Sequence, residues 1–330
     1  MVDLLDEAEL PKFARELLRD PLACAKSTKA GAPELGDLLE FFEIVSDQLR
    51  RKPNLVELGR AVGDVLFVGD THGDLRSTTR VTTHLLEDQV DHLAFLGDYV
   101  DRGAHQLLNF AFVLSLAAVH PKRVTVLRGN HEDLQTNRHY GFLSELALAY
   151  PSEDDLRKVV AAVDATYDSL SLAVTTAGGT IGFHGGVPKT LSRAQDLLRL
   201  PKPHSLFLDA DASSDEGVEW AQKTFFQLSW NDPNEHQSQD WTPSFRGPGI
   251  YRFGEAVLDR FLSASGKRRL VRAHESSRGG FQSLWGGKLL HVFSTEPYFG
   301  QVSRACVVHE ESGGRTVVRD LDFNELLVVE

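Results

Sequence analysis

Three short stretches of the sequence carry polar side chains of the kinds that bind metal ions or transfer protons. They are GDTHGD at 69–74, GDYVDRG at 97–103 and GNHED at 129–133. Each follows an apolar run and places Asp or Asn directly after Gly, where a chain that leaves a strand can turn sharply. An ordinary turn would explain any one of them. Three with the same composition instead favour a shared chemical site.

The residue types in these stretches suit transition-metal cations. Asp and His together are typical ligands of Mn, Fe and Zn, whereas dedicated Mg and Ca sites use oxygen ligands. Two cations held about 3.5–4 Å apart need a carboxylate between them and further ligands on each side. Asp70 and His72 can bind one cation from a single turn, and Asp98 can bridge the pair. Asn130 offers a neutral oxygen to the second cation, which then needs histidine ligands.

Two downstream histidines are candidates for those ligands. His184 in TIGFHGG and His274 in RRLVRAHES each end an apolar, strand-like run. For either one alone, a hydrogen-bonded structural histidine is the simpler interpretation, because the chain has 13 histidines and several must be bystanders. A place at a strand end beside Gly or Ala distinguishes these two from His84, His120, His204 and His236.

The elements expected around the three stretches form βαβ units. Apolar runs at 64–70, 91–98 and 123–130 predict strands, and the segments near 76–88 and 104–119 predict helices between them. This alternation is typical of a largely parallel sheet, in which sites form beyond the carboxyl ends of the strands. The three polar stretches should therefore meet in space.

The rest of the chain predicts further helices and a second set of strands. A Gly-Gly between two strand-like runs at 171–186 indicates a hairpin. Helices are expected at 3–20, 35–51, 153–168 and 254–264, and strands at 268–273, 289–295, 303–309 and 315–320. We expect one α/β domain built on two packed sheets.

Composition limits the partners and the compartment. With 330 residues, 42% of them hydrophobic, and a net charge of -12, the chain should fold into a globular domain without affinity for nucleic acid or anionic membrane. The only cysteines, Cys24 and Cys306, are far apart in sequence, which argues against a disulfide framework. No apolar run approaches the roughly 20 residues of a membrane span, and no signal peptide is visible. We expect a cytoplasmic protein.

Nine motifs in one order resemble the signature of the calcineurin-like metallophosphoesterases, and within them the PPP branch of serine/threonine protein phosphatases. Besides the three stretches above, they are TNRHYGFLSE (136–145), HGG (184–186), WNDP (230–233), RGPGIYRFG (246–254), RAH (272–274) and FSTEPYFG (293–300). The resemblance implies a central two-sheet β-sandwich flanked by helices. It further implies a catalytic domain at 61–330, on which an N-terminal helical segment, 1–60, packs. Asp74, at the end of the first stretch, resembles prokaryotic and archaeal members more than eukaryotic ones.

The resemblance also implies roles for individual residues. Two divalent metal ions are implied, with Mn expected in vitro and Fe or Zn as native alternatives. Metal one would be held by Asp70, His72 and Asp98, and metal two by Asp98, Asn130, His184 and His274. His131 and Asp101 fall where the family keeps its general-acid pair, and the phosphate-binding positions are Arg102, Arg246 and Tyr298. The loop before Tyr298 departs from the family pattern, because Ser-Thr-Glu-Pro-Tyr replaces Ser-Ala-Pro-Asn-Tyr.

The implied activity is hydrolysis of phosphoserine and phosphothreonine in phosphoprotein substrates. A hydroxide that bridges the two metals would attack phosphorus, and His131, oriented by Asp101, would protonate the leaving alkoxide. A hydrolase of dinucleoside polyphosphates or RNA 5′ ends is an alternative, and a non-catalytic phosphoprotein-binding scaffold is another. If the acidic stretch 205–222 borders the site, its Asp209, Asp211 and Asp215 should disfavour acidic phosphopeptides.

Overall fold

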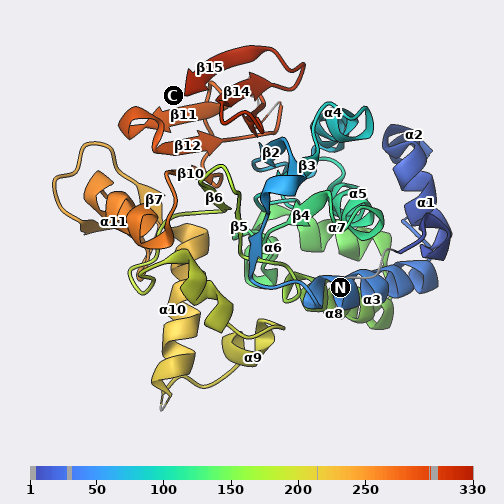
Figure 1. Cartoon of the computed structure of the whole chain (residues 1–330). Helices are drawn as coiled ribbons and strands as arrows, with labels where there is room; N and C mark the ends of the chain where they lie inside the picture. The colour runs from blue at the N-terminus through green and yellow to red at the C-terminus, as the bar shows by residue number, and fades with distance from the viewer. Residues whose placement is uncertain (1–4, 28–31, 214, 297, 299–303, 330) are drawn as a thin grey trace.

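The computed structural model describes residues 5–27, 32–213, 215–296, 298 and 304–329, and within them two six-stranded sheets pack together with helices outside (Figure 1). The first sheet has the order β1 (Leu55–Glu57), β5 (Ala173–Thr175), β6 (Thr180–Phe183), β10 (Arg269–Arg272), β12 (Leu289–Val292) and β11 (Phe281–Leu284). The second has the order β15 (Glu325–Val329), β14 (Thr316–Asp320), β13 (Cys306–Glu310), β2 (Val65–Val68), β3 (His92–Phe95) and β4 (Val124–Val126). The expected α/β fold with two sheets flanked by helices is confirmed.

The parallel part of the second sheet brings three strand ends to one edge. Strands β2, β3 and β4 are parallel neighbours, with Val65 opposite His92 and Leu93 opposite Val124. All three are fully buried, which matches their unbroken apolar sequences. Their carboxyl ends therefore release the three polar stretches side by side. A bridge between Asp70 and Phe293 joins this edge to the chain beyond β12.

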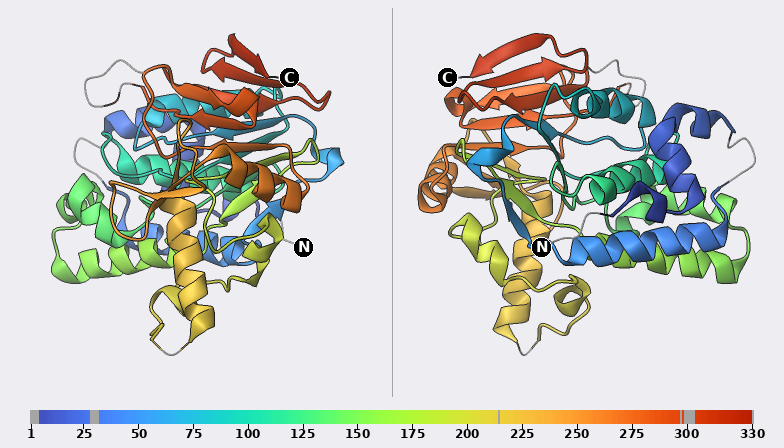
Figure 2. Two further views of the ribbon diagram at one scale, coloured as in Figure 1. Left: turned by 90° about the vertical axis from the view of Figure 1, so that its left-hand side faces the viewer. Right: turned by 45° about the vertical axis from the view of Figure 1, so that its right-hand side comes forward.

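Helices cover the outer faces of both sheets (Figure 2). They are α1 (Lys12–Arg19), α2 (Pro21–Ser27), α3 (Leu35–Arg50), α4 (Leu75–Leu86), α5 (Gln106–Val119), α6 (Leu134–Tyr140), α7 (Phe142–Ala149), α8 (Glu153–Tyr167), α9 (Ser205–Leu208), α10 (Glu216–Trp230) and α11 (Glu255–Ser265). Helix α5 is apolar almost all round and is buried along most of its length, as expected for the central helix of a layer. None of the described helices is long and apolar enough to cross a membrane.

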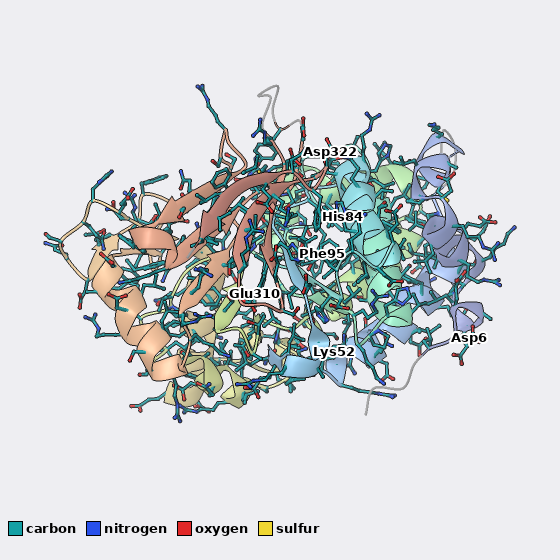
Figure 3. All side chains as sticks on the ribbon, turned by 45° about the horizontal axis from the view of Figure 1, so that its top comes forward. Asp6, Lys52, His84, Phe95, Glu310 and Asp322 are labelled. Carbon is teal, nitrogen blue, oxygen red and sulfur yellow. The ribbon has the colours of Figure 1, made fainter. Side chains whose placement is uncertain are left out.

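The core lies in three layers that follow from this arrangement. Between the sheets, Phe67 and Leu96 from the second sheet pack with Val271 and Leu290 from the first. One outer layer joins the second sheet to α3, α5 and α8, and Phe95, on β3, lies within it (Figure 3). The other outer layer joins the first sheet to α11. Apolar side chains thus pack against both faces of the strands whose ends carry the polar stretches.

Most of the expected elements are present, with three informative differences. The helix expected at 3–20 is divided at Pro11, which separates a short 3-10 helix, Glu7–Glu9, from α1, and its residues 3 and 4 lie outside the described residues. Helix α2, which begins at Pro21, was not predicted. Strands β1, β11 and β15 and a small sheet of β7 (Asp232–Pro233), β9 (Tyr251–Phe253) and β8 (Trp241–Pro243) were not predicted. Strand β1 lies within 1–60, so that segment contributes a strand to the first sheet as well as helices.

Candidate functional site

The loops that leave β2, β3 and β4 adopt backbone conformations that few residues tolerate. Gly97 has a φ of 107°, and a Cβ built there would lie 2.4 Å from the backbone nitrogen of Gly129, so the two loops touch through their backbones. Eight described non-glycine residues have a positive φ, and five of them are predicted site residues: His72, Asp98, Asp101, Arg102 and His274. Such strain persists only where surrounding packing imposes it, and it concentrates at functional sites.

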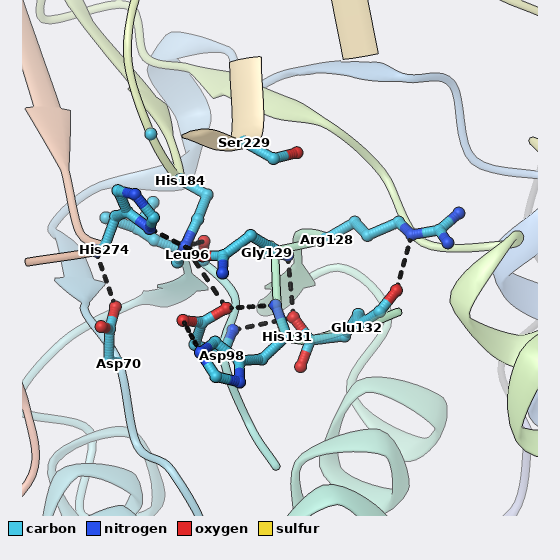
Figure 4. A network of polar contacts seen from close by, with 12 residues as sticks. Asp70, Leu96, Asp98, Arg128, Gly129, His131, Glu132, His184, Ser229 and His274 are labelled. Atoms are coloured by element: carbon cyan, nitrogen blue, oxygen red, sulfur yellow. Dashed lines mark hydrogen bonds and ion pairs between the residues drawn. The ribbon is translucent and has the colours of Figure 1, made fainter. Parts of the chain in front are cut away.

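Asp98 lies at the centre of the predicted ligands (Figure 4). Its Oδ1 is 3.3 Å from His184 Nε2, and its Oδ2 is 3.7 Å from His72 Nε2. The backbone nitrogen of His131 donates to Oδ1 at 3.0 Å. Only 1% of Asp98 is exposed. The carboxylate therefore faces one predicted ligand of each metal, as a bridging group must.

The predicted ligands of metal one leave acceptor atoms without donors. The Nδ1 of His72 lies 2.8 Å from the carbonyl oxygen of Val100, which fixes this nitrogen as the donor and leaves Nε2 as an acceptor. That Nε2 is 3.7 Å from Asp70 Oδ2 as well as from Asp98. Asp70 Oδ2 is buried and has no hydrogen-bond partner among the described residues. Lone pairs from three side chains thus converge on one point.

The predicted ligands of metal two converge in the same way. His184 Nε2 is 2.8 Å and His274 Nδ1 is 2.6 Å from the side-chain oxygen of Asn130. His184 Nδ1 lies 3.0 Å from the carbonyl oxygen of Leu96, so its Nε2 is the acceptor and faces another acceptor. Such an arrangement repels itself unless positive charge is shared between the atoms.

The pKa shifts in the site likewise indicate buried acceptor groups with too little positive charge beside them. Burial, with the charge of Asp98 adding, raises the pKa of Asp70 to about 7. Burial lowers the pKa of His184, but the carboxylate of Asp98 outweighs this, and the pKa ends above its usual value. The residues of this cluster therefore fit divalent metal ions, because two carboxylates, three imidazoles and an amide oxygen are buried together. Ligand atoms of Asp98, His184 and His274 lie within 4.8 Å of one another, as do those of His72, Asp98 and His131.

Glu132 holds the second and third loops in register. Its Oε2 accepts the backbone N–H groups of Asp98 and Gly129, each at 2.8 Å, and its Oε1 accepts that of Tyr99 at 2.9 Å. The side chain is fully buried, and burial, followed by the charge of Asp98, raises its pKa to about 7. Asp133, which follows it, accepts from Thr136 and so begins α6.

His131 and Asp101 form a close pair beside the cluster. The Nδ1 of His131 lies 2.7 Å from Asp101 Oδ2, and Asp101 is fully buried. Burial lowers the pKa of His131, but Asp98 and Asp101 outweigh it, so the pKa is raised overall. The ring of His131 also lies edge-on to that of His72, with centroids 4.7 Å apart. The pair is therefore next to the predicted metal one ligands and holds its imidazole in one orientation.

The predicted phosphate-binding residues lie on two sides of the cluster. Tyr298 stacks on His72 with ring centroids 5.6 Å apart, and Arg102 lies 5.7 Å from the centre of the Tyr298 ring. Arg246 approaches from the metal two side, where its Nε lies 2.6 Å from Asp232 Oδ2. The other oxygen of Asp232 is 3.8 Å from His274 Nε2. The Asp232 carboxylate thus lies between Arg246 and the predicted metal two ligand His274.

The structure brings all eleven predicted site residues to this edge of the sheets and adds others that sequence reasoning missed. Tyr140 lies under Arg102, with the guanidinium carbon 4.3 Å from the ring centre. Asp232 accepts from Arg272 as well as Arg246. Asn137 donates to Asp101. Asn137, Tyr140, Asp232 and Arg272 could have been suspected, because they fall inside the motifs at 136–145, 230–233 and 272–274.

Two cavities open on either side of the cluster. One, of about 850 Å³, reaches His72, Arg102 and Tyr298 and is closed by α2 and α4. The other, of about 730 Å³, begins at Asn130 and runs past α10, with Asp209 among its lining residues. Asp211 and Asp215 are not among its lining residues. The Asp211 carboxylate accepts from Ser213, and that of Asp215 caps the start of α10. Among the acids of the stretch 205–222, Asp209 therefore fulfils the condition on which the hypothesis about acidic phosphopeptides depends, whereas Asp211 and Asp215 do not.

Comparisons with known proteins identify similar chains. The family model described as calcineurin-like phosphoesterase matches residues 63–277. A probable serine/threonine-protein phosphatase of Encephalitozoon cuniculi is 33% identical over 238 residues, which cover 72% of this chain and 48% of that protein. The serine/threonine-protein phosphatase PP2A-like PPG1 of Candida albicans is 29% identical over 255 residues, covering 76% and 55%. The chain thus spans about half the length of these curated relatives.

Solved structures show the same fold. A protein serine/threonine phosphatase of Saccharomyces cerevisiae with similarity to human phosphatase PP5 superposes with a TM-score of 0.76, at 24% identity, over 96% of each chain. The cold-active protein-tyrosine phosphatase of a psychrophilic Shewanella gives a TM-score of 0.57, at 18% identity, over 86% of this chain and 84% of that one. These likenesses establish the architecture, and the chemistry has to be argued from the site itself.

Proposed function

The chain belongs to the calcineurin-like phosphoesterase family, and from that premise we propose that it is a metal-dependent serine/threonine protein phosphatase. The observation that carries the proposal is the convergence of unshared acceptor atoms around Asp98, directly beside the His131–Asp101 pair. Curated relatives named as serine/threonine-protein phosphatases add support. In this proposal residues 61–330 form the catalytic domain and 1–60 a segment that packs on it. A cytoplasmic location and a prokaryotic or archaeal origin remain predictions.

Two divalent cations would occupy the cluster. Their ligands would be Asp70, His72 and Asp98 for one, and Asp98, Asn130, His184 and His274 for the other. When bound, the cations supply Lewis acidity that activates water near neutral pH and offsets the charge of the phosphoryl group. Nitrogen and oxygen ligands together suit Mn, Fe and Zn. We propose Mn as the metal active in vitro, with Fe or Zn as native alternatives.

His131 would act as the general acid. Its Nδ1 is engaged by Asp101, so Nε2 is the atom left to donate a proton to the serine or threonine oxygen as the ester bond breaks. The buried carboxylate of Asp101 stabilises the imidazolium before transfer and keeps the ring from rotating. An alkoxide is a poor leaving group, so this proton is needed most with phosphoserine and phosphothreonine.

The two arginines would bind and orient the phosphoryl group. A guanidinium can donate two parallel hydrogen bonds to phosphoryl oxygens, which fixes the angle of attack as well as the position. The Tyr140 ring supports Arg102, and the Asp232 carboxylate supports Arg246, so both guanidinium groups are oriented before substrate arrives. Tyr298 lies between Arg102 and His72 and can donate to the same group from its phenol.

Substrate competition tests the proposal. We expect the purified protein with Mn²⁺ to hydrolyse phosphoserine and phosphothreonine peptides with a kcat/KM at least about tenfold above that for diadenosine tetraphosphate. A faster rate on diadenosine tetraphosphate or on an RNA 5′ triphosphate would replace the proposal with a nucleotide hydrolase. Preference for a phosphotyrosine peptide would refute the assignment to serine and threonine. No hydrolysis of any phosphate ester would leave a phosphoprotein-binding scaffold.

A further inference from the structure

A buried chain of hydrogen bonds lies behind the His131–Asp101 pair and is not used by the mechanism above. It runs from the phenol of Tyr167, at the end of α8, through the side chain of Asn137, on α6, to the carboxylate of Asp101. Asn137, Tyr167 and Asp101 are each fully buried, and His131 is 4% exposed. Three separate elements thus meet at one carboxylate, out of reach of bulk water.

The Asn137 amide binds both members of the acid pair. Its Nδ2 donates to Asp101 Oδ2 at 2.8 Å and to the backbone carbonyl oxygen of His131 at 2.8 Å. An amide nitrogen has two protons, so both donors are used. Asp101 belongs to the loop after β3 and His131 to the loop after β4. This one side chain therefore sets the position of one loop relative to the other, at the point where the 2.7 Å contact between Asp101 and His131 is made.

The Tyr167 hydroxyl determines which way the Asn137 amide points. It donates to Asn137 Oδ1 at 3.1 Å, so the oxygen faces α8 and the nitrogen faces Asp101. A rotated amide would place its oxygen against the Asp101 carboxylate and its nitrogen against the phenol, which would bring two acceptors together in a buried site. The hydrogen bond from Asn137 to Asp101 therefore depends on the orientation that Tyr167 imposes on the amide.

Asp101 needs such support because its backbone is strained. Its φ is 66°, a left-handed conformation that residues with a side chain rarely adopt and that persists only where the surroundings impose it. Its Oδ1 accepts the backbone N–H of Phe142 at 3.0 Å, and its Oδ2 accepts from both His131 and Asn137. Without Asn137, one of the bonds that locate the shared oxygen is lost.

We propose that Asn137 is a positioning residue for the general acid, and that Tyr167 keeps its amide in the working orientation. The two residues hold Asp101 and the backbone of His131 together so that His131 Nε2 faces the oxygen of the leaving group. This inference rests on the proposed function, because it assumes that His131 donates a proton there. Neither residue touches substrate or metal in this scheme.

Dependence on the leaving group tests the proposal. A phosphoserine peptide releases an alkoxide that needs the proton, whereas p-nitrophenyl phosphate releases a phenolate that hardly does. For Asn137→Ala, kcat on phosphoserine should fall about 10- to 100-fold, which is less than complete loss of a general acid would cost, about 10²–10⁴. On p-nitrophenyl phosphate, kcat should fall by less than about threefold. Tyr167→Phe should show the same selectivity at about three- to tenfold, with KM for both substrates unchanged.

Two controls separate positioning from stability and from failure of the proposed function. Tyr150→Phe removes another phenolic hydrogen bond of the helical layer, to the carbonyl oxygen of Pro33 at 2.7 Å, and should leave both rates unchanged. His131→Ala should itself be selective for phosphoserine. If it is, and the Asn137 and Tyr167 variants lower both rates equally or neither, the positioning role is overturned alone. If His131→Ala is not selective, the acid assignment falls and the positioning role with it.

Discussion

Replacing Glu132 with glutamine should weaken metal binding without removing any metal ligand. The Glu132 carboxylate accepts three backbone N–H groups, those of Asp98, Tyr99 and Gly129. Asp98 is the proposed bridge, and Gly129 precedes the proposed ligand Asn130. A change in how Glu132 holds these backbones should therefore move ligands of both metals.

The size of the effect follows from the three bonds. In Glu132→Gln the amide oxygen can still accept the two N–H groups now bound to Oε2, but the amide nitrogen faces the N–H of Tyr99. One hydrogen bond is lost and a buried donor is left unpaired, which costs about 1–3 kcal/mol in the metal-free protein. Because burial raises the pKa of Glu132, removal of its charge offsets part of this cost, and the net loss of stability should be smaller. Loss of an outer-shell carboxylate should lower metal affinity about 10- to 100-fold.

Glu145→Gln is the matched control for this prediction. Glu145 accepts the backbone N–H groups of Leu107 at 2.8 Å and Gln106 at 3.2 Å, at the start of α5. It should lose about 1–2 kcal/mol of stability for the same reason, while its metal affinity stays within about twofold of the wild type. Guanidinium unfolding of the metal-free variants at about pH 8, where Glu132 is ionised, gives the stability term.

Metal affinity is then measured by competition with a fluorescent chelator for Mn²⁺ or Zn²⁺. The reasoning is refuted if Glu132→Gln loses stability as expected yet binds metal as tightly as the wild type, because the ligand loops would then keep their shape without the carboxylate. Equal losses of affinity in the Glu132 and Glu145 variants would refute it as well, since general loosening of the fold would explain both.

Three further predictions follow from individual contacts. Asp98→Asn should lower the affinity for both metals by at least about 10-fold, which is the effect of changing an outer-shell residue. Metal analysis after dialysis should show reduced occupancy of both sites, and loss of only one metal would contradict the role of Asp98 as a bridge. Asp209→Asn should reduce the kcat/KM preference for basic over acidic phosphopeptides about two- to fivefold, the size of an exposed ion pair, whereas Asp211→Asn should not. Burial, followed by the charge of Lys52, lowers the pKa of Lys202 from 10.5 to about 7. Between about pH 7 and pH 10.5 the unfolded chain therefore binds more protons than the folded one, and stability should rise with pH. Denaturant unfolding gives the free energy of unfolding at about pH 7 and pH 9.5, and its increase between them should be about 1–3 kcal/mol smaller in Lys202→Met than in the wild type. Equal increases in both proteins would exclude the pKa shift.

Much of the fold was predictable because its signals are local. The runs before 69–74, 97–103 and 129–133 are short, apolar and end at Gly, and each is a strand whose end points to the same edge. Parallel pairing then brings the polar side chains together without further information. Asp70, His72, Asp98 and Asn130 could be chosen as ligands from residue type and position for this reason. His184 and His274 follow strands of the other sheet, and for either one alone a structural histidine was the simpler interpretation.

Other parts depend on partners that are distant in sequence. Strand β1 has three residues and no alternating pattern, and it is a strand because β5 offers it a parallel edge. The pairing of Arg246 with Asp232 needs the small sheet that joins β7 and β9. Asn137 meets Asp101 and Tyr167 only through the packing of α6 and α8 on the sheet. Side-chain bonds across 30 or more residues carry no signal in local composition.

Local signals were also passed over. Pro11 is a typical helix-start residue, and it divides the N-terminal helix that was expected at 3–20. In the acidic stretch 205–222, composition suggested a common role, but Asp215 begins a helix and Asp211 closes a turn, which are the usual positions of Asp. These local roles distinguish Asp211 and Asp215 from Asp209.

Metal titration of the metal-free protein tests the central claim most directly. The protein is stripped with a chelator, and Mn²⁺ is added back while hydrolysis of a phosphoserine peptide is followed. We predict no hydrolysis without metal and recovery that saturates at two equivalents per chain, because the cluster offers two sets of ligands joined by one carboxylate. Phosphoserine hydrolysis that persists after complete removal of metal would contradict the account.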